Sequence, residues 1–155
     1  MDHARSDPGR AGTVRLLNRS ERHMSVETNV IGVIRVTNAM LPVRRSASPW
    51  IVNMPSTRRL TYAAEHPRRR NGPHLRCVLP SKSFLKAITV QYATELHGTN
   101  ILINAACPGY VATDLNGFRG VRPPAEGAAI AIRLATLPDN GPTGGFFDDA
   151  GVVGW

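Results

Sequence analysis

The stretch "SKSFLKAITVQYATELHGTNILINAACPG", residues 81–109, decides the fold that we expect for this chain. We predict a helix over about residues 79–97, because Pro80 is tolerated in a first helical turn and Gly98 stands where a left-handed residue ends many helices. "ILINAA", residues 101–106, is short and continuously apolar, as a buried parallel strand is. A helix followed directly by a buried strand is a typical unit of an α/β domain.

The segments on both sides continue this alternation. Residues 25–41 have apolar side chains at spacings of three and four, and Pro42 ends the run, which favours a helix. The other predicted elements are a strand at 50–54, a helix at 123–137, and a short strand within "GPTGGFFDDAG", residues 141–151. The sequence therefore predicts an α/β domain whose parallel sheet has about three strands, with helices flanking it.

Composition fits one domain of ordinary globular character. The chain has 155 residues, of which 42% are hydrophobic and 19% charged. No apolar run approaches the roughly 20 residues of a membrane span, and the N-terminus lacks an apolar signal core. Cys77 and Cys107 stand in unrelated contexts and the five histidines are scattered, so we predict no metal site. We expect a cytoplasmic protein.

Positive charge is concentrated in the first half of the chain. Residues 1–76 contain 14 Arg against 5 acidic residues, a charge of +9, whereas residues 77–155 contribute −1, so the net charge of +8 comes from the first half. We expect residues 1–24 to form a basic, disordered arm and residues 55–76 a basic loop within a folded unit at 25–155. Clustered Arg68, Arg69 and Arg70 leave open an Arg-rich nucleic-acid-binding module, although the aromatic side chains that stack on bases are almost absent nearby.

Several short motifs occur together in one order. They are "TNVIGV" (28–33), "IVNMPS" (51–56), "PSK" (80–82), "INAACPGYVATDL" (103–115), "PAEGA" (124–128) and "PTGGFFDD" (142–149). With these motifs, residues from about 27 to 155 resemble the C-terminal half of a short-chain dehydrogenase/reductase of the carbonyl-reductase-like kind. The resemblance implies part of a Rossmann-like domain and NADP or NAD as cofactor.

The resemblance also implies roles for particular side chains. Enzymes of this family transfer hydride to or from a carbonyl carbon, and the oxygen then needs a proton donor and hydrogen bonds. Lys82 matches the family lysine that holds the cofactor ribose and lowers the pKa of a tyrosine. Ser56 matches the serine that binds the carbonyl oxygen, and Asn29 matches an asparagine that anchors a water beside the lysine.

The residue at the family's tyrosine position is Val78, four residues before Lys82, where both side chains would share one helix face. Valine cannot donate a proton. Tyr92 lies ten residues beyond Lys82, so we expect it at the far end of the helix. Tyr62 has no fixed spacing to the lysine. Tyr110 follows the Pro-Gly loop, and the resemblance implies that a residue there shapes the pocket.

The loop "CPGYVAT", residues 107–113, resembles the segment that covers the nicotinamide ring. The resemblance assigns cofactor contacts to Pro108, Gly109, Val111 and Thr113. The family's Gly-rich strand–turn–helix, which binds the pyrophosphate, has no match in these 155 residues.

Three hypotheses follow from these observations. The first is a truncated or degenerate relative of an NAD(P)-dependent oxidoreductase, inactive alone. The second is an active NADP-dependent carbonyl reductase that uses Ser56 and Lys82 on a small carbonyl substrate, and the third is the nucleic-acid-binding module. The resemblance also implies a homodimer through helices 25–41 and 81–97. From the composition we expect no membrane association, and the sequence does not favour nucleic acid as a partner.

Overall fold

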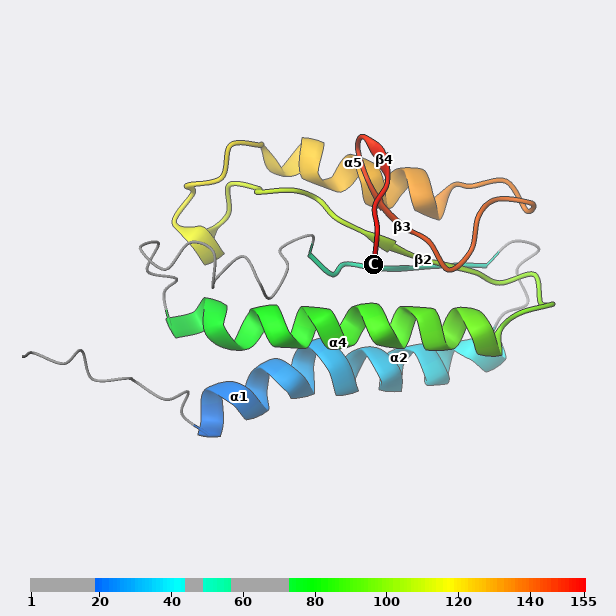
Figure 1. The fold of residues 1–155 in the computed structure, drawn as a ribbon, viewed down its shortest axis with the longest axis horizontal. Coiled ribbons are helices and arrows are strands. Elements are labelled where there is room, and N and C mark those ends of the chain that lie inside the picture. The colour runs from blue at the N-terminus through cyan, green and yellow to red at the C-terminus, as the bar shows by residue number, and fades with distance from the viewer. Residues whose placement is uncertain (1–18, 44–48, 57–72) are drawn as a thin grey trace, which may run out of the picture.

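The computed structural model of the chain describes residues 19–43, 49–56 and 73–155. In this part of the chain, one small sheet separates helices that lie on its two faces (Figure 1). The strands are β1 (Trp50–Asn53), β2 (Leu102–Ala106), β3 (Phe146–Asp148) and β4 (Gly151–Val152). The predicted α/β fold class is therefore confirmed.

The sheet is mixed, with the order β1-β2-β3-β4. β1 is parallel to β2, with Val52 opposite Asn104, and β2 is parallel to β3. The fourth strand, which we did not predict, pairs antiparallel with β3. A tight turn makes this pairing possible, because Ala150 N donates to Asp148 Oδ1 and Gly151 adopts a φ of +129° that favours glycine.

The first helical region is longer than predicted. It comprises α1 (Arg19–Val26), the π-helical turn η1 (Glu27–Ile31), α2 (Gly32–Met40) and the 3-10 turn η2 (Leu41–Val43). Residues 19–24 therefore belong to a helix, which corrects that part of the arm expected at 1–24; residues 1–18 lie outside the described residues. The π-turn widens the helix by one residue, since Gly32 N donates to Glu27 O, and such bulges are frequent at functional sites.

Helix α4 (Pro73–Glu95) begins about six residues earlier than predicted. Pro73 occupies its first position, where the missing N–H costs nothing, so part of the basic loop expected at 55–76 is helical. Pro80 consequently lies inside the helix and not in its first turn. Gly98 has a φ of +80°, as expected for the residue that reverses the chain after the helix.

The core forms around β2, whose five residues are all buried. Helix α5 (Pro124–Ala135) covers one face of the sheet with Ile130 and Leu134, which pack with Ala106 and Phe147. α1, η1 and α2 lie beside α4 on the opposite face (Figure 1). No helix among the described residues is long and apolar enough to cross a membrane.

Candidate active site

Lys82 lies on α4 and reaches the end of β1. Its Nζ donates a hydrogen bond of 2.7 Å to the carbonyl oxygen of Met54, the residue that follows the strand. The lysine side chain is partly buried, and this burial lowers its pKa below the ordinary value of 10.5 because the ammonium has lost hydration. The sequence pointed to this lysine but gave no signal for its backbone partner.

Val78 precedes Lys82 by one helical turn, as the spacing predicted. Its carbonyl oxygen accepts a hydrogen bond of 2.8 Å from Ser81 Oγ, so the backbone is engaged within the helix. Its aliphatic side chain offers no proton. An acid that acts on a substrate beside Lys82 must therefore come from elsewhere.

Neither of the two described tyrosines, Tyr92 and Tyr110, occupies the place of Val78 on α4. Tyr92 is buried, and its hydroxyl donates a hydrogen bond of 2.6 Å to Asn38 Oδ1 on α2. This contact holds it away from Lys82, in agreement with the sequence argument. Tyr110 is exposed on the loop after β2, and Tyr62 lies outside the described residues.

Asn29 sits in the π-helical turn and reaches across to α4. Its Nδ2 donates a hydrogen bond of 2.9 Å to Ser81 Oγ, and Ser81 is fully buried beside Lys82. Adjacent residues of α4 thus make two separate long-range hydrogen bonds: Ser81 bonds Asn29, and Lys82 bonds the Met54 carbonyl. Ser81 belongs to the "PSK" motif, yet sequence reasoning assigned it no role.

Ser56 lies two residues beyond Met54 and is partly buried, after the buried Pro55. Its place after β1 is the place that the sequence predicted. Because β1 and β2 are parallel, their carboxyl ends lie at the same end of the sheet. Ser56 comes after β1, so it and the loop that follows β2 lie at this end of the sheet. The first turns of α4 lie at the same end (Figure 1).

The loop from Cys107 to Thr113 is tightly constrained. Cys107 N donates to Phe147 O, Gly109 adopts a φ of +77°, and Val111 forms a bridge with Arg122. Thr113 caps the 3-10 helix η3 (Asp114–Asn116) in a reciprocal capping box with Asn116. The hydroxyl of Thr113, for which the resemblance predicted a cofactor contact, thus already accepts a bond within the loop.

Arg122 joins this loop to two other elements. Its Nη1 donates to the carbonyl oxygen of Pro108 at 3.2 Å, and its guanidinium forms ion pairs with Glu126 on α5 and with Asp149 in the β3–β4 turn. We predicted no role for Arg122 from the sequence, because two of its partners, Pro108 and Asp149, are distant along the chain. Its effect is to fix the loop 107–122 against the end of the sheet.

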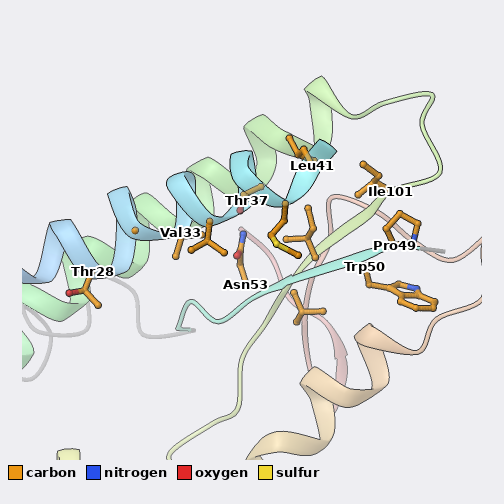
Figure 2. A pocket seen from close by; sticks show the side chains of 13 residues that line it. Thr28, Val33, Thr37, Leu41, Pro49, Trp50, Asn53 and Ile101 are labelled. Atoms are coloured by element: carbon orange, nitrogen blue, oxygen red, sulfur yellow. The ribbon is translucent and has the colours of Figure 1, made fainter. Parts of the chain in front are cut away.

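A separate cavity of about 810 Å³ lies away from Lys82. It runs along β1 beneath α2, and Figure 2 shows Asn53 pointing toward the helix while Trp50 points away from it. Its lining is mostly apolar and includes neither Lys82 nor the 107–113 loop. Among the described residues, no cluster of acidic, histidine and cysteine side chains is suited to a metal ion.

Comparison with known proteins places these features in a family. The family model described as "short chain dehydrogenase" matches residues 9–121. The chain is 35% identical over 98 residues to "Carbonyl reductase [NADPH] 1" of Bos taurus, covering 56% of this chain and 35% of that protein. It is 31% identical over 157 residues to "(+)-neomenthol dehydrogenase" of Capsicum annuum, covering 79% of this chain and 49% of that protein.

Solved structures agree on the fold. An NADPH-bound carbonyl reductase from chicken fatty liver superposes with a TM-score of 0.70 at 22% identity, covering 97% of this chain and 64% of that one. Salutaridine reductase from Papaver somniferum gives a TM-score of 0.64 at 25% identity, covering 83% and 55%. The chain thus spans about a third to a half of the length of the two curated relatives named above.

Proposed function

This chain belongs to the short chain dehydrogenase family and is carbonyl reductase-like; from that premise we propose that it keeps the lysine site of such an enzyme but does not catalyse carbonyl reduction unaided. The observation that carries the proposal is the pair Val78 and Lys82 on α4. The lysine is held at the carboxyl end of β1, while the residue one turn before it has no acidic proton.

The residues present fit the nicotinamide-ribose end of a dinucleotide. An ammonium group has three N–H donors, and the bond to Met54 O uses one of them. Arg122 holds a loop at the carboxyl end of the strands, and this loop contains Pro108, Gly109, Val111 and Thr113. The relatives named above include NADPH-dependent carbonyl reductases. A bound cofactor of this class would supply hydride for a carbonyl carbon.

Proton supply is the step for which this chain lacks a residue. Hydride addition leaves an alkoxide, which must receive a proton from a donor within hydrogen-bond reach. Lys82 would hold the cofactor ribose, and Ser56 would bind the carbonyl oxygen. Asn29 and Ser81 would position the helix turn that carries the lysine. Val78 leaves the acid's position aliphatic, so turnover is absent or very slow.

The second candidate is an active NADP-dependent carbonyl reductase in which Lys82 itself is the acid. One observation favours it: burial lowers the pKa of Lys82, so this ammonium releases its proton more readily than an exposed lysine does. The two candidates differ in whether turnover occurs and whether it depends on Lys82.

The test combines turnover with nucleotide binding. The purified chain is incubated with NADPH and a panel of ketones and aldehydes, and loss of nicotinamide absorbance is followed. We expect no Lys82-dependent turnover, but weak NADPH binding by fluorescence titration that falls about tenfold or more in Lys82→Met. Lys86→Met is the matched control, since Lys86 lies one turn further along α4 over the ring of Phe146.

Turnover by the wild type that disappears in Lys82→Met would overturn the first candidate and establish the second. Binding that Lys82→Met and Lys86→Met weaken equally would show that the site does not recognise the nucleotide through Lys82. Nucleic-acid binding gains no support, because the matching family is one of oxidoreductases. Arg68, Arg69 and Arg70 lie outside the described residues.

A further inference from the structure

Asn-Gly pairs occur three times in the chain, at residues 71–72, 116–117 and 140–141. In such a pair the main-chain nitrogen of glycine can attack the Cγ of asparagine, because glycine has no side chain that hinders the approach. The structure describes the second and third pairs, whereas residues 71–72 lie outside the described residues. The two described pairs differ in what restrains the asparagine side chain.

The side chain of Asn116 is restrained at both ends of its amide. Its Nδ2 donates a hydrogen bond of 2.6 Å to Val111 O, and its Oδ1 accepts from Thr113 N and Arg119 N. The residue is half-buried within η3. Rotation of this amide would break all three bonds, so attack on its Cγ by Gly117 N requires local opening of the loop.

The side chain of Asn140 has no such restraint. It is exposed in the turn between α5 and β3, and it makes no hydrogen bond within the part of the chain that the structure describes. The glycine N–H is bonded in both pairs: Gly141 N donates to Pro138 O at 2.8 Å. Gly117 N donates likewise to Asp114 O at 3.1 Å. The two glycines are therefore restrained alike, and the difference lies in the freedom of the asparagine side chain.

From this comparison we infer that Asn140 is a site of deamidation in the folded protein, and that its bonds protect Asn116. Gly141 N loses its proton to a solvent base and forms a bond to Asn140 Cγ. The bond from Cγ to Nδ2 then breaks, and ammonia leaves with a proton from solvent. Water adds to either carbonyl carbon of the resulting succinimide ring and opens it. The products are aspartate and isoaspartate, whose main chain runs through Cγ.

The two products differ in their effect on the turn. Both add a negative charge, but isoaspartate also lengthens the main chain by one carbon atom. Gly141 has little room to move, since a Cβ built on it would lie 3.0 Å from Leu137 Cβ and 3.4 Å from Leu102 Cδ1. Leu137 O in turn accepts a hydrogen bond of 3.0 Å from Trp50 Nε1. Isoaspartate should therefore loosen the segment after α5 from β1 and β2, whereas aspartate should not.

The test follows the change from amide to acid in the whole 155-residue chain. Folded protein and urea-unfolded protein are incubated in the same mildly alkaline buffer, and mass spectrometry quantifies the peptides that contain each Asn-Gly pair. In the folded protein we expect Asn140 to react at least about tenfold faster than Asn116. In urea the two should react within about threefold of each other, because the hydrogen bonds of Asn116 are then lost.

Two variants separate the reaction from its consequence. Asn140→Gln should abolish the reaction at this position, because glutamine closes the corresponding larger ring far more slowly. Asn140→Asp carries the added charge on a main chain of normal length. The isoaspartate form is isolated by chromatography and identified by enzymatic methylation of its free carboxylate. We expect it to unfold at a lower urea concentration than Asn140→Asp does.

Three rate patterns would overturn the inference. They are equal rates at Asn140 and Asn116 in the folded protein, reaction at Asn140 only in urea, and a rate difference that urea leaves unchanged. The last would assign the selectivity to the sequence neighbours and not to the hydrogen bonds of Asn116. An isoaspartate form as stable as Asn140→Asp would overturn the effect on the turn.

Discussion

Asn29 Nδ2 lies 2.9 Å from Ser81 Oγ, and this hydrogen bond joins the π-helical turn η1 to the turn of α4 that carries Lys82. Ser81 also donates to the carbonyl oxygen of Val78, one turn before the lysine. A fully buried serine therefore connects Asn29 to the carbonyl oxygen of Val78. In the proposed site, this bond would hold the helix turn that carries Lys82.

The energetic coupling of Asn29 and Ser81 can be measured with a double-mutant cycle. Asn29→Ala and Ser81→Ala should each reduce the free energy of unfolding by about 1–2 kcal/mol, and their coupling should be about 0.5–1.5 kcal/mol. Urea denaturation of the four proteins gives these values. The exposed ion pair of Arg35 and Glu27 is the control cycle, with an expected coupling near zero. Additive effects at Asn29 and Ser81 would refute the bond's contribution.

Replacing Val78 by tyrosine should supply the proton donor that the proposed site lacks. A phenol at this position lies one turn before Lys82, whose positive charge would favour the phenolate and so increase its acidity. We expect Val78→Tyr to reduce carbonyl compounds with NADPH at least about tenfold faster than the wild type. Val78→Phe supplies the same ring without the hydroxyl and should not gain activity. Equal rates for the two variants would contradict the assignment of position 78.

The partly buried ammonium of Lys82 predicts a specific dependence of stability on pH. Its pKa in the folded protein is below the ordinary 10.5, so at pH values between the two the unfolded chain binds more protons. The free energy of unfolding of the wild type should therefore rise with pH across that window, relative to Lys82→Met. Denaturation of both proteins from pH 7 to about pH 10.5 measures the difference. A difference that is flat or falls with pH would contradict the burial of the charge.

Two isoleucines of α5 test which face of the helix forms the core. Ile130 is 1% exposed and packs with Leu134, whereas Ile132 is 61% exposed. Ile130→Ala should cost about 2–5 kcal/mol, and Ile132→Ala should change stability by no more than about 0.5 kcal/mol. Thermal and urea unfolding compare the two. Similar losses would mean that α5 packs on the sheet in another orientation.

Arg122 should hold the 107–122 loop in place. Arg122→Met removes the hydrogen bond to Pro108 O and the ion pairs with Glu126 and Asp149. We therefore expect the amides of Ala112 and Val121, which bond across the loop, to exchange about tenfold faster than in the wild type. Arg119→Met is the control, since Arg119 is exposed and bonds locally to Asn116 O. Unchanged exchange in Arg122→Met would show that the backbone alone fixes the loop.

Local sequence patterns were enough to predict three alternating helices and strands in their order, though not β4, and the contents of the motif around Lys82. Apolar periodicity, prolines at helix starts and Gly98 at a helix end act through residues only a few positions apart. For the same reason the spacing of Val78 and Lys82 on one helix face was predictable. The boundaries of the elements could not be predicted in this way. Pro73 and Pro80 both suit a helix start, and α4 begins at Pro73.

Contacts between distant residues required the folded chain. Lys82 meets Met54 O across 28 residues, Asn29 meets Ser81 across 52, and Trp50 Nε1 donates to Leu137 O across 87. No local pattern encodes such pairs, because they arise only when helices pack on the two faces of one sheet. The sequence thus determined which chemical groups the chain carries. It also determined that position 78 has an aliphatic side chain, which cannot donate a proton. Packing decided which of them meet, and it also formed the cavity between α2 and β1.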